Sequence, residues 1–298
     1  MRINPRQVEA FHKVILTGGV TSAANMMNIT QPAVSRLIRD FEYAVNLKLF
    51  NRDGRGLVPR DEAMKLYREV ERLYLGLEHI ARIADEIRHS KGSVLRIATV
   101  HALSTLCANE IFPTLLEKVA DISLFLDIES TNHITDVIAG NQYDIGFVFG
   151  QAGVKGLEAE LLAQANAVAV LSAEHVLAGA DAITLDDLTR YRSIIPGRKT
   201  PLREQIEQQV IQQQLYLHSP IETSLANCCT LAANNSGIGI VDSMTALNYQ
   251  GNIIIKPFLP EITIAYLALY PPQIPKSLLV EQITENMRFH IAAALAKK

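Results

Sequence analysis

Residues 30–39 form a short run of side chains suited to recognising nucleic-acid bases. Arginine and glutamine each make two hydrogen bonds to one base edge in the major groove of DNA, and serine also contacts base edges. Helical spacing places these residue types on one face, together with a proline: Gln31, Pro32, Ser35, Arg36 and Arg39. We therefore expect this face to contact duplex DNA. A face that is merely solvated remains the alternative on the local pattern alone.

Nearby residues are suited to holding the DNA backbone. Hydroxyl side chains close to the starts of two short helices favour phosphate contacts, because backbone N–H groups at helix N-termini also attract anions. Two arginines on a predicted hairpin would neutralise further phosphate charge. The predicted backbone contacts are Thr21, Ser22, Thr30, Arg52 and Arg55.

Short helices must position these side chains. Apolar residues at helical spacing predict one helix over residues 5–16 and a second from residue 21 onward. The third helix is expected to follow Thr30 as its N-cap, with Pro32 in the first turn, where proline is tolerated. Its apolar face lies opposite the polar run and is expected to be buried: Val34, Leu37, Ile38, Phe41 and Val45.

A hairpin follows the third helix. Apolar pieces at residues 47–50 and 57–58 flank Asp53-Gly54, a strong turn signal. Three helices and a hairpin predict an N-terminal all-α winged helix-turn-helix domain over residues 1–59.

Residues 60–89 carry the most regular apolar spacing in the chain. The apolar positions alternate at intervals of three and four, which is the spacing of a two-stranded coiled coil. They are Ala63, Leu66, Val70, Leu73, Leu77, Ile80, Ala84 and Ile87. We expect a coiled-coil linker helix that dimerises; packing on its own domain is the alternative. The polar run at residues 89–93 is expected to end the helix and act as a hinge.

From residue 92 to the end, apolar strands alternate with helices. This order predicts a doubly wound α/β fold with parallel sheets. The length suits two lobes, which we place at residues 92–163 with 265–298 and at residues 164–264. In such folds a ligand binds in the crevice at the carboxyl ends of the strands.

The charge of the chain is unevenly distributed. Residues 1–60 hold nine Lys and Arg against four Asp and Glu, a net charge of +5, and the 298-residue chain has −3, so residues 61–298 carry −8. A basic head on an acidic body indicates that only the head meets a polyanion such as DNA. An uneven solvated surface would have the same charges.

Composition further narrows the class of protein. A run of about 18 consecutive apolar residues is absent, so we expect no membrane span. The N-terminus has no apolar signal segment, and three cysteines cannot build a disulfide framework. We therefore expect a cytoplasmic protein.

The sequence offers little support for an enzyme. It lacks the glycine-rich dinucleotide and Walker loops and the Gly-x-Ser-x-Gly nucleophile elbow. The eight histidines show no paired metal spacing, and Cys228-Cys229 lacks the Cys-x-x-Cys geometry of redox sites. We expect no catalytic residue, no cofactor and no metal; the cysteines, Cys107 included, are expected to be buried small apolar residues.

The head resembles the DNA-binding domain of LysR-type transcriptional regulators. The resemblance extends over the whole chain, as a head, a dimerising linker helix and a two-lobed effector domain of the periplasmic-binding-protein type. Members often have a Thr cap before the linker helix, where this chain has Arg60-Asp61, so Asp61 is a candidate cap. The stretches that carry the resemblance are Phe11-His12-Lys13-Val14, Gly18-Gly19-Val20-Thr21-Ser22-Ala23-Ala24, Thr30-Gln31-Pro32-Ala33-Val34-Ser35-Arg36-Leu37-Ile38 and Leu49-Phe50-Asn51-Arg52-Asp53-Gly54-Arg55-Gly56-Leu57-Val58-Pro59.

The resemblance implies how the protein binds DNA. Gln31, Pro32, Ser35 and Arg36 would make the principal base contacts and nearby backbone contacts. A homodimer or homotetramer would bind paired half-sites in double-stranded promoter DNA. That agrees with the coiled-coil spacing of the linker helix, since two joined heads meet successive major grooves.

Two further stretches resemble the LysR-proper and opine-responsive branch, whose effectors are amino acids or their derivatives: Asp144-Ile145-Gly146-Phe147 and Gly237-Ile238-Gly239-Ile240-Val241-Asp242-Ser243-Met244-Thr245-Ala246-Leu247-Asn248-Tyr249. Backbone N–H groups after the strands could receive a carboxylate, and Asp242 an ammonium. Asp242 has an equal alternative as a helix cap. The candidate effector contacts are Val100, His101, Ala102, Ser104, Thr131, Asn132, Pro196, Gly197, Ser224 and Asp242.

Three functions fit these observations. The first is a regulator whose DNA binding is controlled by a small-molecule effector bound between the two lobes. The second is a small-molecule binding protein or enzyme that uses the head only to oligomerise. The third, a DNA-architectural protein without a ligand, requires side chains to fill the crevice. The basic head favours the first.

Overall fold

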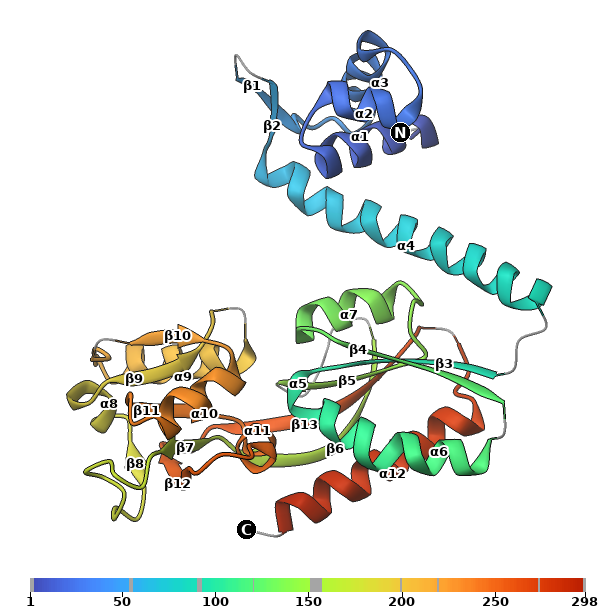
Figure 1. Cartoon of the computed structure of the whole chain (residues 1–298). Helices are drawn as coiled ribbons and strands as arrows, with labels where there is room; N and C mark the ends of the chain where they lie inside the picture. The colour runs from blue at the N-terminus through green and yellow to red at the C-terminus, as the bar shows by residue number, and fades with distance from the viewer. Residues whose placement is uncertain are drawn as a thin grey trace. The chain divides into compact units, whose positions relative to one another are not determined.

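The computed structural model describes the whole chain except residues 1–2, 54–55, 90–92, 120, 151–156, 199, 219, 273 and 297–298. The chain divides into two compact units, Met1–Asp85 and Glu86–Lys298. Figure 1 shows the helical head and the linker helix in the first unit, and two sheets with their helices in the second.

The first unit is a winged helix-turn-helix, as the sequence predicts. It contains helices α1 (Pro5–Thr17), α2 (Val20–Met27) and α3 (Gln31–Val45), followed by strands β1 (Phe50–Asp53) and β2 (Gly56–Pro59). The two strands pair antiparallel, with Phe50 opposite Pro59. Gly18 ends α1 at φ 72°, a left-handed conformation that glycine adopts without steric cost.

The core of the head comes from the apolar faces of all these elements. The Phe11 ring lies 5.1 Å from that of Phe41 and 5.9 Å from that of Phe50, measured between centroids. Val34 and Ile38 of α3 are buried in the same cluster. This packing holds α3 by one side and leaves the other side exposed.

The linker helix α4 (Asp61–His89) divides its apolar positions between two environments. Ala63 and Val70 are buried in the core of the head. Leu73, Leu77 and Ile80 are 56%, 53% and 64% exposed. The expected seam therefore packs on its own domain at its start and is uncovered further along. Asp61 lies inside the first turn instead of preceding it as a cap.

The second unit has two sheets. The five-stranded sheet has the order β4-β3-β5-β13-β6, and the six-stranded sheet has the order β10-β9-β11-β7-β12-β8. The strands of the first are β3 (Ser93–Thr99), β4 (Ile122–Ile128), β5 (Ile145–Gly150), β6 (Glu158–Asn166) and β13 (Thr263–Tyr270). Those of the second are β7 (Val168–Leu171), β8 (Ile183–Thr184), β9 (Ser193–Pro196), β10 (Ile221–Thr223), β11 (Ile238–Val241) and β12 (Ile254–Leu259).

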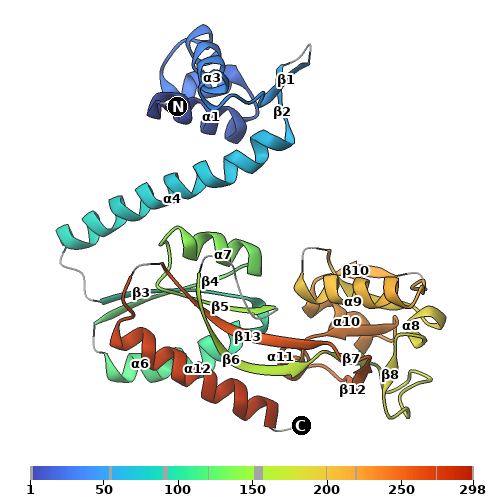
Figure 2. The same ribbon diagram turned by 180° about the vertical axis from the view of Figure 1, so that it is seen from behind.

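Helices cover both faces of the five-stranded sheet, as expected of a doubly wound fold. Figures 1 and 2 show α7 on one face and α6 with α12 on the other. The helices of this unit are α5 (His101–Leu106), α6 (Phe112–Lys118), α7 (Thr131–Ala139), α8 (Asp187–Arg190), α9 (Pro201–Gln212), α10 (Leu225–Ala233), α11 (Ser243–Asn248) and α12 (Leu278–Ala296). A π-helical segment, Cys107–Ile111, joins α5 to α6. None of the described helices is long and apolar enough to cross a membrane.

The prediction of parallel sheets holds for only part of each sheet. Strand β3 is parallel to β4 and β5, but β13 is antiparallel to β5 and to β6. Strand β7 is likewise antiparallel to β11 and β12. The reason is the path of the chain, which leaves the first sheet after β6 and returns to it only at β13. The lobe divisions expected at 163/164 and 264/265 fall inside these two strands.

Candidate DNA-binding face and effector cleft

Helix α3 separates its apolar and polar residues onto opposite sides. Val34, Ile38 and Phe41 are at most 2% exposed. The polar residues singled out in the sequence lie opposite them: Gln31, Pro32, Arg36 and Arg39 are exposed, and Ser35 is half-buried. The predicted recognition face is therefore open to solvent in the first unit.

Weak local contacts order the side chains on this face. Gln31 Nε2 donates to Ser35 Oγ at 3.1 Å, and Arg39 Nε donates to the Ser35 carbonyl at 3.4 Å. Arg36 Nε lies 3.8 Å from Asp40 Oδ2, and the Arg36 side chain is 78% exposed. An exposed ion pair at this distance contributes little stability, so the guanidinium is available for an outside partner.

The structure describes only some of the predicted phosphate-contacting side chains. Thr21, Ser22 and Thr30 are exposed. Thr30 occupies the N-cap position of α3, but its side chain makes no capping hydrogen bond. Arg52 belongs to β1, with its side chain outside the described residues, and Arg55 lies outside them altogether.

A cavity of about 230 Å³ lies between the two lobes of the second unit, each of which is built around one sheet. Its lining comes from the loops that follow β3, β4 and β9 and from the starts of several helices. The lining residues are Val100, His101, Glu129, Ser130, Thr131, Phe149, Thr200, Pro201, Ser224, Leu225, Ala226 and Thr245.

The N-terminal ends of three longer helices border this cavity. Thr200 is the N-cap of α9, Ser130 that of α7 and Ser224 that of α10. Ser130 Oγ accepts from the N–H of His133, and Ser224 Oγ accepts from that of Asn227, each at 3.3 Å. Helix N-termini carry partial positive charge and free N–H groups, so this arrangement favours an anionic group such as a carboxylate.

Comparison with known proteins decides the family. Residues 88–290 match the model of the LysR substrate binding domain, and residues 5–63 match that of the bacterial regulatory helix-turn-helix protein, lysR family. The chain belongs to the LysR family. It is accordingly a DNA-binding transcriptional regulator with an effector-binding domain.

Relatives of this LysR-family regulator match along nearly the whole chain. The regulatory protein NocR of Agrobacterium tumefaciens (strain T37) is 34% identical over 94% of each chain. The octopine catabolism/uptake operon regulatory protein OccR of Rhizobium meliloti is 34% identical over 97% of each chain. The crystal structure of CbnR, a LysR family transcriptional regulator, shares the fold with a TM-score of 0.60 at 12% identity, covering 97% of this chain and 99% of CbnR.

Four of the predicted effector contacts of the LysR-family regulator line the cavity: Val100, His101, Thr131 and Ser224. The other predicted contacts do not. Ala102, Ser104 and Pro196 are buried, and the Pro196 carbonyl accepts from Arg203 Nη1 at 3.2 Å. Asn132 is exposed, and Gly197 donates its N–H to the Thr223 carbonyl at 2.9 Å.

Asp242 lies wholly inside the protein. Its carboxylate caps α11 by accepting from the N–H of Thr245 at 3.0 Å and from the Thr245 hydroxyl. The Tyr266 hydroxyl donates to it at 3.0 Å. Burial raises the pKa of Asp242 above its ordinary value, while these hydrogen bonds oppose the rise. The capping alternative is confirmed, and Asp242 has no surface that an effector ammonium can reach.

Sequence reasoning missed part of the cavity lining. Glu129 directly follows β4, and Thr200-Pro201 opens α9. The Thr-Pro pair is a recognisable helix start that could have been found. Glu129 also follows a strand, directly before the pair Ser130-Thr131, but no local signal separates it from a solvated loop residue.

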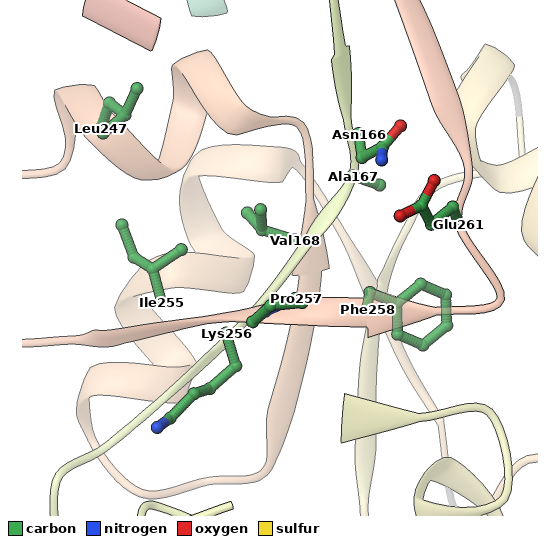
Figure 3. Close-up of a pocket in the computed structure, with 9 residues that line it drawn as sticks. All are labelled: Asn166, Ala167, Val168, Leu247, Ile255, Lys256, Pro257, Phe258 and Glu261. Atoms are coloured by element: carbon green, nitrogen blue, oxygen red, sulfur yellow. The ribbon is translucent and has the colours of Figure 1, made fainter. Parts of the chain in front are cut away.

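A second cavity, of about 570 Å³, is larger, but its polar side chains do not point toward one place. Figure 3 shows its lining, in which Asn166 and Glu261 lie together while Lys256 points away from them. The rest is apolar: Ala167, Val168, Leu247, Ile255, Pro257 and Phe258. Of these two cavities, this one is the larger, but the grouped helix N-termini make the smaller cleft the candidate effector site.

The cysteines are buried apolar residues, as expected. Cys107, Cys228 and Cys229 are 0% exposed. Burial raises the pKa of each thiol to about 12, so each stays protonated at neutral pH. No group of three or more His, Cys, Asp or Glu residues among those described is placed to hold a metal ion.

Proposed function

We propose that this regulator reads promoter DNA with the exposed face of α3 and is controlled by an amino-acid derivative bound in the cleft. The observation that carries the DNA half is the exposed polar face of α3 above a buried apolar side. In this proposal Gln31, Ser35 and Arg36 contact base edges, and Pro32 packs against the groove. The backbone is held by Arg39, Thr21, Ser22, Thr30, Arg52 and Arg55.

The DNA half is tested with Arg36→Ala in the full chain. The probe is a duplex selected by repeated binding from random sequence. Loss of one bidentate base contact costs about 1–3 kcal/mol, or about 5- to 150-fold in affinity. Fluorescence anisotropy should show that loss for the selected duplex and a smaller one for unrelated DNA.

Arg190→Ala is the matched control, because Arg190 is also exposed and paired with an acid one turn away, but it belongs to α8 in the second unit. It should leave affinity unchanged. Equal affinity of the Arg36 variant and the unaltered chain for the selected duplex would contradict the role given to α3.

The effector half rests on the helix starts around the cleft, which favour a carboxylate. The relative OccR is named for an octopine catabolism and uptake operon, which supports amino-acid derivatives of this kind as candidates. The cavity of about 230 Å³ lies below the roughly 300–1,000 Å³ usual for drug-sized ligands, so a small effector is expected. An effector that contacts both lobes favours one lobe arrangement over others and thereby shifts the population of DNA-binding states.

A thermal-shift screen of the full chain against amino acids and octopine tests the effector half. A compound that binds only the folded protein raises Tm with its concentration. Ala226→Phe places a ring in the cavity and should abolish the rise; Ala233→Phe, at the other end of α10, should not. The proposal fails if no compound raises Tm or if the Ala226 variant responds normally.

A further inference from the structure

The effector cleft contains an acidic group that the proposed function does not yet use. Glu129 is the one Asp or Glu among the described residues that line the cavity, and those residues include no Lys or Arg. The helix starts of the cleft attract an anion, whereas this carboxylate repels one. A ligand must therefore suit both the helix starts and the Glu129 carboxylate.

The backbone of Glu129 is fixed while its side chain is open. Its N–H donates to the Thr99 carbonyl at 3.0 Å, which ties the residue to the end of β3, next to the end of β4. The side chain is exposed. Within the described part of the chain, no hydrogen bond or ion pair engages its carboxylate. The carboxylate therefore extends from a fixed backbone position at the cleft and is available to a ligand.

The two lobes contribute different chemistry to the cavity. Glu129, His101 and Thr131 come from the lobe of the five-stranded sheet. Thr200-Pro201 and Ser224-Leu225, at the starts of α9 and α10, come from the other lobe. A ligand that spans the cleft thus meets the Glu129 carboxylate beside the start of α7 on one side and the starts of α9 and α10 on the other.

We propose that Glu129 determines effector specificity by accepting a hydrogen bond from a cationic group, an ammonium or a guanidinium. The effector is then zwitterionic, with its cationic end at Glu129 and a carboxylate toward the starts of α9 and α10. This inference rests on the proposed effector function of the same cleft. It excludes purely anionic effectors such as simple dicarboxylates, because they would leave Glu129 facing a like charge.

Glu129→Gln in the full chain tests the proposal with L-arginine and octopine as zwitterionic probes and succinate as an anionic one. Calorimetric titration should show that the unaltered chain prefers the zwitterions to succinate. The variant should bind the better zwitterion at least about tenfold more weakly, as expected for loss of a charged hydrogen-bond partner, and bind succinate no more weakly than before.

Two further variants separate specificity from stability. Glu129→Asp keeps the charge and should retain most of the preference. Glu117→Gln makes the same charge change on the exposed side of α6, away from the cavity lining, and should alter no affinity.

Equal zwitterion affinity of the Glu129→Gln variant and the unaltered chain overturns the role of Glu129 while leaving the cleft as the effector site. Binding that persists in Ala226→Phe instead shows that the ligand lies elsewhere and overturns both proposals. Absence of zwitterion binding to the unaltered chain also overturns both.

Discussion

At the scale of single residues, Asp242 shows how a polar side chain shapes the cleft without touching its contents. The carboxylate is 0% exposed and is bonded to the N–H and the hydroxyl of Thr245 and to the Tyr266 hydroxyl. Thr245 lines the cavity. Asp242 is therefore a positioning residue for the cleft wall, and its burial raises its pKa above the ordinary value of 3.8.

The variant Asp242→Asn should show how much the buried charge of Asp242 destabilises the folded protein. Because the folded-state pKa is raised, the group's contribution to stability is present below its unfolded pKa and is lost as pH rises through the folded pKa. An asparagine does not titrate and keeps an acceptor for the Thr245 N–H. The Tm of the variant relative to the unaltered chain should therefore rise as the pH is raised above about 4, the ordinary pKa of an unfolded aspartate.

Asp242→Ala is the contrasting variant. It leaves the Thr245 N–H and the Tyr266 hydroxyl without this acceptor inside the protein and should destabilise by about 1–3 kcal/mol. A Tm difference between the Asn variant and the unaltered chain that does not change with pH would contradict the raised pKa.

The exposed polar face of α3 was predictable from sequence, and most of the lining of the cleft was not. The face follows from helical periodicity, which places Arg36 and Arg39 opposite Val34 and Ile38 within a few residues. The cleft combines residues separated by more than a hundred positions, such as His101 and Ser224. Helix starts after strands located some of them, but nothing local distinguished lining residues from Asn132 or Gly197.

At the scale of elements, local signals predicted those whose residues carry a strong pattern. The apolar patterns predict strands over residues 122–128 and 238–241 and a helix over residues 278–295. Strands β4 and β11 occupy the predicted residues, and α12 is one residue longer than the predicted helix. Strand β6 was missed. Its residues are mainly Ala, Glu, Gln and Leu, which have weak strand propensity. It lies at the edge of its sheet, paired with β13 about a hundred residues later, and a local pattern carries no information about that pairing.

Helix α4 also shows a limit of pattern reading. Its regular apolar spacing fits two alternatives: α4 pairs with a partner helix, or α4 packs on its own domain. In the structure the start of α4 packs in the head through Ala63 and Val70, so the second alternative holds there. Beyond that point the same spacing continues on a surface that the chain itself leaves open.

At the scale of the whole molecule, this open surface supports a proposal that the protein is at least a dimer. Leu73, Leu77 and Ile80 are spaced by four and three residues, which places them on one helix face, and each is more than half exposed. Aligned large apolar side chains of this kind are stabilised when a second helix covers them. A second copy of the chain carries the matching seam, so we expect α4 to pair with α4 of another copy.

Leu73→Glu combined with Leu77→Glu should abolish this pairing, because it places carboxylates in the seam of both copies. Analytical ultracentrifugation of the unaltered chain should give at least twice the 32.9 kDa of one chain, and the variant should give a smaller assembly. The head core, which uses Ala63 and Val70, should remain folded by circular dichroism.

Arg68→Glu changes an exposed residue on the opposite side of α4 and serves as the control. Retention of the full mass by the double variant would place the interface elsewhere. A smaller assembly of the double variant that still binds the selected duplex with unchanged affinity would instead separate pairing from DNA recognition, since two joined heads bind paired half-sites more tightly than one.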